Sequence, residues 1–170
     1  MEKLQQKSFF PQYKDSYVFT RTTRCKWALN KAQQLNIKVL DNSAKKVACY
    51  CPEYTLIEKL QTISTKYRLQ QASETMPINF LRHYYDVYQL LQSERVTSFI
   101  GTDEYHRHKD KRFRNEDEKD ITKNEAFLLG NKTTRDLYTQ SYKEKSSIYF
   151  GEQPSFGAIL NKIAEYAKVL

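Results

Sequence analysis

Residues Pro52 to Leu91, PEYTLIEKLQTISTKYRLQQASETMPINFLRHYYDVYQLL, decide the fold of this chain. Apolar residues recur in this stretch at spacings of three and four, which is the pattern of a helix with one buried stripe. The pattern stops between Ser73 and Pro77, because proline cannot continue a helix and disfavours helical geometry in the residue before it. We therefore predict two helices packed as a hairpin. The two buried stripes are Leu56, Leu60, Ile63 and Tyr67, and Phe80, Tyr84, Val87 and Leu91.

Charged residues flank both stripes. At about 100° per residue, Lys59 lies beside the buried face of the first helix, and Lys66 follows on the same side. In the second helix, Arg82 and Asp86 are four residues apart and share a face. If both flanks border one groove, these charges suit a triphosphate and a divalent cation. The alternative is an ordinary solvated pair worth about a few tenths of a kcal/mol, and spacing alone favours that alternative.

Two segments, PEYTLIEKL (52–60) and LRHYYDVYQLL (81–91), carry a family resemblance. In that order they resemble the later half of the AbiEii/AbiGii family, the nucleotidyltransferase toxins of bacterial abortive-infection and toxin-antitoxin systems. The segments FIGTDEYHRHKDKRF, DITKNEAFLL and YFGEQPSFGAIL resemble those that close the family's C-terminal helical domain. The resemblance extends from about residue 46 to the C-terminus.

The resemblance implies an activity and roles for single residues. Members transfer NMP from an NTP to an RNA such as tRNA, with Mg²⁺ at the active site. Lys59 stands where a lysine contacts the nucleotide phosphates, and Asp86 stands where an acidic residue of the active site is expected. Arg82 lies in the same motif and is expected to bind nucleotide. His83 stands where many relatives are acidic, which puts a second carboxylate from this helix in doubt.

The chain departs from the family before Pro52. Members carry there a Gly/Ser-rich loop and an Asp-x-Asp strand, because nucleotidyl transfer needs N–H groups around the phosphates and carboxylates for the metals. Residues 1–51 contain no glycine and no Asp-x-Asp. We therefore expect the C-terminal part of such a toxin, inactive alone and with no metal site of its own, since Mg²⁺ and NTP belong to an intact relative. Its expected partners are the missing N-terminal lobe or a cognate antitoxin, and an RNA. The alternative is a non-catalytic module that binds nucleic acid or the antitoxin.

Length and composition predict the architecture. A chain of 170 residues with 39% hydrophobic content fits one domain, with an N-terminal part (1–51) and a C-terminal helical part (52–170). We predict a mainly α fold, a bundle of about six helices with a small N-terminal two-stranded β element. That element is expected to pair IKVL (37–40) with KKVACYC (45–51). Sparse cysteines and the absence of a long apolar segment predict a cytoplasmic protein without a membrane span.

The most basic stretch follows Thr102, which is expected to cap a helix. Its cations are candidates for holding an RNA backbone within a chain of net charge +8. The acidic segment NEDEKD (115–120) follows at once, so neutralisation within the chain is an equal alternative. His106 and His108 are two residues apart, diverge on a helix and are expected at the surface. The nucleic-acid candidates are Arg107, Lys109, Lys111 and Arg112.

Overall fold

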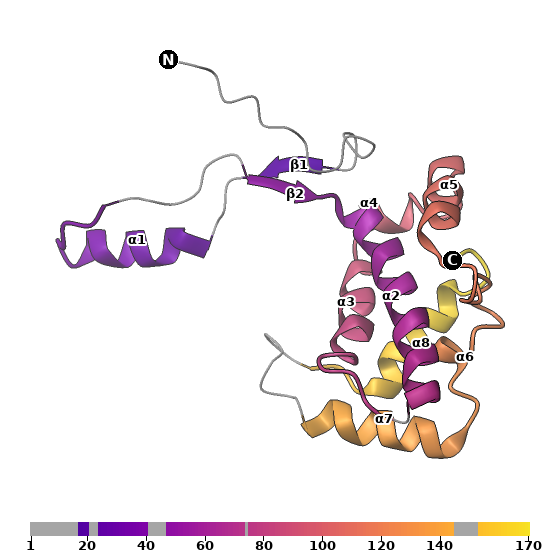
Figure 1. The fold of residues 1–170 in the computed structure, drawn as a ribbon. Coiled ribbons are helices and arrows are strands. Elements are labelled where there is room, and N and C mark those ends of the chain that lie inside the picture. Colours follow the sequence, from indigo (N-terminus) through magenta and orange to yellow (C-terminus); the bar gives the residue numbers. More distant parts are fainter. Residues whose placement is uncertain (1–16, 21–23, 41–46, 74, 145–152) are drawn as a thin grey trace. The chain divides into compact units, whose positions relative to one another are not determined.

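The computed structural model describes residues 17–20, 24–40, 47–73, 75–144 and 153–170 (Figure 1). The chain divides into two compact units, Met1–Cys51 and Pro52–Leu170, and each is described by itself. The expected mainly α fold is confirmed. Within the described ranges there are eight helices, not about six, and α4 (Glu94–Thr97) and α6 (Glu125–Leu128) are single turns.

The N-terminal unit contains strand β1 (Tyr17–Thr20), helix α1 (Arg24–Gln34) and strand β2 (Val47–Tyr50). The strands pair antiparallel, with Tyr17 opposite Tyr50 and Thr20 opposite Val47. The predicted pairing of residues 37–40 with the second strand was therefore wrong. Those four residues form no strand, and the N–H of Ile37 donates to the Ala32 carbonyl at 2.9 Å, which ties the segment to the end of α1.

The helical unit is built on α2 (Pro52–Ser73) and α3 (Arg82–Leu90), which pack against each other as the predicted hairpin. Both predicted stripes enter the core, where Leu60 of α2 and Tyr84 of α3 are completely buried. Tyr67 is partly buried against the same core. Because the stripes face the core, the polar flanks of the two helices border the hairpin's edges.

The remaining helices of this unit pack around the hairpin (Figure 1). Helices α4 and α5 pack against α2, and α8 packs against α3, α6 and α7. Two of them begin at capping hydroxyls: Thr102, as predicted, accepts from the N–H of Tyr105, and Ser155 accepts from the N–H of Ala158. No helix in the described ranges is long and apolar enough to cross a membrane. The remaining bounds are α5 Asp103–Arg112, α7 Lys132–Glu144 and α8 Phe156–Tyr166.

Tyrosines form much of the core, and the hydroxyls of two of them donate hydrogen bonds within it. The Tyr84 hydroxyl donates to the Ala126 carbonyl at 2.6 Å, and the Tyr138 hydroxyl donates to Gln70 Oε1 at 2.9 Å. The ring of Tyr84 meets that of Phe156 edge to face, with centroids 5.3 Å apart. Leu137 of α7 is 47% exposed, and the buried side chains of this helix are those of Tyr138 and Tyr142.

Candidate functional site

Of the predicted site residues Lys59, Arg82 and Asp86, the first and last meet across the hairpin. Lys59 Nζ lies 2.7 Å from Asp86 Oδ2, so α2 and α3 are joined by an ion pair. The same ammonium lies 3.4 Å from His83 Nδ1. The exposed fractions of the Lys59, Asp86 and His83 side chains are 27%, 25% and 18%, so a solvent-borne anion can reach them. We call these three residues the Lys59 cluster.

His83 is the neutral member of this cluster. Its burial, and then the charges of Lys59 and Lys66, lower its pKa from 6.5 to about 4. At neutral pH the ring therefore carries one proton, and an unprotonated Nδ1 can accept from the Lys59 ammonium. Lys66 lies one to two turns further along α2, where burial and the charge of Lys59 lower its pKa. The charges of Lys59 and Lys66 thus both act on His83 against the single carboxylate of Asp86, an excess of positive charge that suits an anion.

Arg82 does not join this cluster. It is exposed at the first position of α3, and within the described part of the chain it makes no ion pair with Asp86, four residues away. The Arg82–Asp86 pair considered in the sequence analysis is thus replaced by the Lys59–Asp86 pair. Sequence reasoning treated His83 only as a departure from the family pattern, although its spacing of three from Asp86 places both on one face.

A second charged cluster uses the neighbouring residue of α2. Glu58 accepts from His108 Nε2 at 3.2 Å and from Arg112 Nη2, which joins α2 to α5. Burial alone would raise the pKa of Glu58, but the bonds to His108 and Arg112 outweigh it and hold the pKa below 4.5. The ring of Tyr54 packs edge-on against His108, with centroids 4.8 Å apart. We call Glu58, His108 and Arg112 the Glu58 cluster.

The expected surface position of His108 was wrong, because only 4% of its side chain is exposed. His106 is exposed, as expected. The two rings diverge on α5, so one faces solvent and the other faces α2. The spacing of four between His108 and Arg112 was a signal in the sequence that both could reach one partner.

The basic stretch of α5 bonds mainly to its own unit. Arg107 pairs with Glu104, and Arg112 pairs with Glu58. Lys109 donates to the main-chain oxygen of Leu170 and lies over the rings of Tyr105 and Phe113. Lys111 is exposed. Nucleic-acid binding by these four residues stays a prediction, although three of them already have intramolecular partners.

The acidic segment after α5 also turns inward. Asp117 is buried, accepts from the hydroxyl of Thr65, and pairs with Arg68 Nε at 2.8 Å. One pair does link this segment to α5, between Lys119 and Asp110 at 2.9 Å. The alternative of mutual neutralisation therefore holds only in part, because Arg112 and Asp117 pair with Glu58 and Arg68 of α2.

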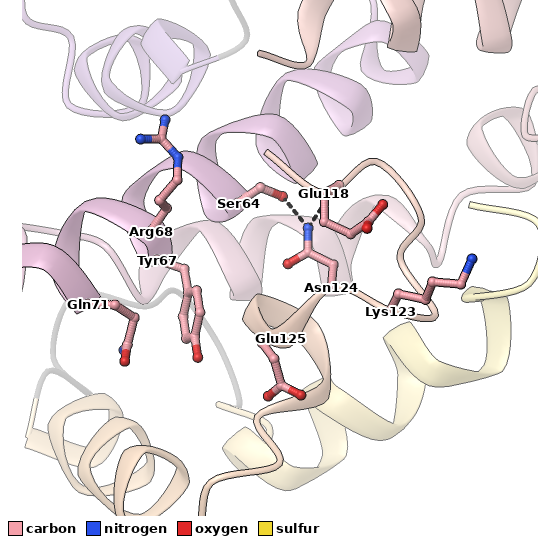
Figure 2. Close-up of a pocket in the computed structure, with 8 residues that line it drawn as sticks. All are labelled: Ser64, Tyr67, Arg68, Gln71, Glu118, Lys123, Asn124 and Glu125. Carbon is pink, nitrogen blue, oxygen red and sulfur yellow. Dashed lines mark hydrogen bonds between the residues drawn. The ribbon is translucent and has the colours of Figure 1, made fainter. Parts of the chain in front are cut away.

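Figure 2 shows an open polar pocket on a different side of α2. Its central amide, Asn124 Nδ2, donates to Ser64 Oγ at 2.9 Å and to the Glu118 carbonyl at 2.6 Å. Asn124 Oδ1 accepts from the Ala126 N–H and so caps α6. These bonds give Asn124 a structural role, and no residue of the Lys59 cluster lines the pocket. The lining residues are Ser64, Tyr67, Arg68, Gln71, Glu118, Lys123, Asn124 and Glu125.

The described residues do not fit a divalent cation site. Among them no three His, Cys, Asp or Glu side chains are grouped so that they could hold a metal. Asp86 is already the partner of Lys59, and a single paired carboxylate leaves most of the Mg²⁺ coordination shell to other donors. The geometry therefore supports an anion site more directly than a metal site.

Comparison with known proteins identifies a family. A family model described as "Nucleotidyl transferase AbiEii toxin, Type IV TA system" matches residues 24–162, which is most of the chain. No curated protein and no solved structure matches this chain. The matched region includes the complete Lys59 and Glu58 clusters. The chain therefore belongs to the AbiEii family of nucleotidyl transferase toxins.

Proposed function

We propose that the Lys59 cluster holds the triphosphate of an NTP during nucleotidyl transfer to an RNA such as tRNA. The observation that carries this proposal is the position of the Lys59 ammonium, between Asp86 and His83 and open to solvent on one side. Family membership supports the reaction class. A lysine held by a carboxylate and a neutral acceptor is fixed in place before the ligand arrives, which lowers the cost of ordering it on binding.

Each residue of the cluster has a separate task in this proposal. Lys59 donates to a phosphate oxygen, where charge builds up during transfer. Asp86 fixes the ammonium, and His83 adds an acceptor without the extra charge that a second carboxylate would set against phosphate. Lys66 adds positive potential from the next turns of α2. Arg82, exposed beside His83, serves as a second cation that reaches the ligand only when it binds.

Catalysis requires more than this cluster. Because the described residues group no carboxylates for a metal, we propose that the metal-binding groups come from outside the Lys59 cluster. The residues before Pro52 contain neither a glycine nor an Asp-x-Asp. A partner that brings carboxylates and a phosphate-binding loop would complete the site, and the chain by itself would bind nucleotide without transferring it.

Calorimetry of the purified chain with each of the four NTPs, with and without Mg²⁺, tests this function. Wild-type protein should bind at least one NTP, and Lys59→Met should weaken that binding by about 1–3 kcal/mol because a charged contact is lost. Lys132→Met is the matched control, since Lys132 is an exposed lysine of α7 paired with Asp136. Equal affinities for the two variants would end the assignment of Lys59.

The second candidate is a module that binds an antitoxin without catalysis. Membership of a toxin-antitoxin family favours an antitoxin as a partner. This candidate predicts a stable complex with the cognate antitoxin that Lys59→Met leaves intact, together with no NTP binding by the wild-type chain. The same calorimetric series therefore separates the two functions.

A further inference from the structure

The net charge of this protein is concentrated in its N-terminal unit. Residues 1–51 contain ten Lys and Arg but three Asp and Glu, a formal charge of +7. Residues 52–170 contain eighteen Lys and Arg and seventeen Asp and Glu, a formal charge of +1. Nearly all of the total of +8 thus belongs to less than a third of the chain.

In the helical unit, the cations are compensated by specific contacts as well as by number. Half of its basic residues form ion pairs with carboxylates of the same unit. The pairs are Lys59–Asp86, Arg68–Asp117, Arg95–Glu53, Arg107–Glu104, Arg112–Glu58, Lys119–Asp110, Lys123–Asp120, Lys132–Asp136 and Lys162–Glu165. A phosphodiester backbone that bound there would have to displace these carboxylates.

The described part of the N-terminal unit presents the opposite situation. Residues 24–40, RCKWALNKAQQLNIKVL, carry four cations and no acidic residue. Arg24 and Lys31 are seven residues apart in α1, so their positions lie on one face of the helix. Lys31 and Lys38 are both exposed. We call α1 and residues 35–40 the α1 basic segment.

We propose that the α1 basic segment binds the phosphodiester backbone of a nucleic acid. Phosphates contacted by these exposed lysines would release condensed counterions, which makes such a surface the preferred site for a polyanion on this protein. This binding does not depend on Lys59, so it stands or falls separately from the nucleotide site.

The neighbours of these cations favour nucleic acid over a lipid surface. Asn30, Gln33 and Gln34 are exposed on α1 and offer amide groups that suit phosphates and base edges. A membrane-binding helix would carry an apolar face in place of such amides. Exposed apolar residues do follow α1, at Leu35, Ile37, Val39 and Leu40, and they make anionic vesicles the necessary competitor in any test.

Fluorescence anisotropy of the full chain with a labelled single-stranded RNA, and with DNA of the same sequence, tests the proposal over a range of salt concentrations. The double variant Lys31→Glu with Lys38→Glu should weaken binding by about tenfold or more and lower the salt slope by about 2. The matched control is Lys143→Glu with Lys168→Glu, two exposed lysines of the helical unit with the same change of charge. It should change affinity by less than about threefold, because its positions lie outside the proposed surface.

The outcomes separate clearly. Equal weakening by both double variants would show attraction by total charge alone, and a larger effect of the control would assign binding to the helical unit; either result overturns the proposal. Wild-type protein that binds phosphatidylserine vesicles but neither RNA nor DNA also overturns it. Comparison of RNA with DNA identifies which backbone is preferred. Circular dichroism checks folding, and Lys31→Gln with Lys38→Gln repeats the test if the glutamate variant unfolds.

Discussion

Glu58 and Lys59 are neighbours in the sequence, yet they serve two different clusters. Glu58 joins α2 to α5, through His108 and Arg112, and Lys59 joins α2 to α3, through Asp86 and His83. Both clusters contain one cation, one carboxylate and one histidine. The difference lies in the histidine: the side chain of His108 is 4% exposed and that of His83 is 18% exposed.

This difference separates a structural contact from an available site. A buried partner cannot be rehydrated when its bond is lost, so the Glu58 cluster should contribute strongly to stability. The members of the Lys59 cluster can exchange protein partners for water or for a ligand at little cost. We infer that the first cluster fastens two helices and that the second is kept available for an anion.

The largest loss of stability is expected from truncating a core residue of α2. Leu60 lies one residue after Lys59 and is completely buried, so Leu60→Ala should cost about 2–5 kcal/mol of unfolding free energy. Leu69→Ala is the control, because Leu69 is in the same helix and 50% exposed. Urea unfolding of both variants measures the difference. Similar losses in the two would show that the burial of the α2 stripe is assigned incorrectly.

Glu58→Gln should come next, with a loss of about 1–3 kcal/mol, because it leaves Arg112 and the buried His108 without their carboxylate. Asp136→Asn serves as its control, since it removes the carboxylate of an exposed pair on α7 and should cost less than about 1 kcal/mol. If the two variants unfold at the same urea concentration, the Glu58 cluster does not stabilise the packing of α2 against α5.

The stability of the protein should also depend on pH through His83. The pKa of His83 is lowered to about 4, so between roughly pH 6.5 and pH 4 the unfolded chain binds more protons than the folded protein. His83 should therefore lower stability as the pH falls through that window, by on the order of 3 kcal/mol. His83→Gln should reduce this loss, and His106→Gln, at an exposed position, should not.

The pKa of His83 also reports on Lys59. The lysine's charge follows burial as a cause of the low pKa, so Lys59→Met should move the pKa of His83 upward. NMR titration of the His83 ring protons measures the shift, and Lys132→Met should leave it unchanged. An unchanged pKa of His83 in the Lys59→Met variant would mean that the two side chains are not neighbours in solution.

The hairpin could be predicted from sequence because its apolar residues repeat with the helical period. The same period placed Lys59 and Asp86 on flanks that meet in the structure. It could not choose the partner of Asp86, because spacing along one helix ranks Arg82 as highly as a lysine on another helix. The burial of His108 was missed for a related reason, since it depends on how α5 packs against α2.

The strand pairing shows a different limit. Residues 37–40 have the composition of a strand, but β2 pairs with β1, which lies much further away along the chain. Local composition indicates that a segment can extend and does not identify its partner. Similarly, the run of cations in α5 was visible in sequence, whereas the carboxylates that pair with them come from α2 and from α5 itself.

The most direct test of the central claim measures stability and NTP affinity together in Glu58→Gln and Lys59→Met. Glu58→Gln should lower the melting temperature and keep its NTP affinity at a temperature where the variant is folded. Lys59→Met should keep its melting temperature within a few degrees, since a partly exposed pair is worth about 0–1 kcal/mol, and should lose about tenfold or more in affinity. Loss of affinity in Glu58→Gln with loss of stability in Lys59→Met, or equal loss of both in both variants, would contradict the claim that the Glu58 cluster stabilises the fold and the Lys59 cluster binds an anion.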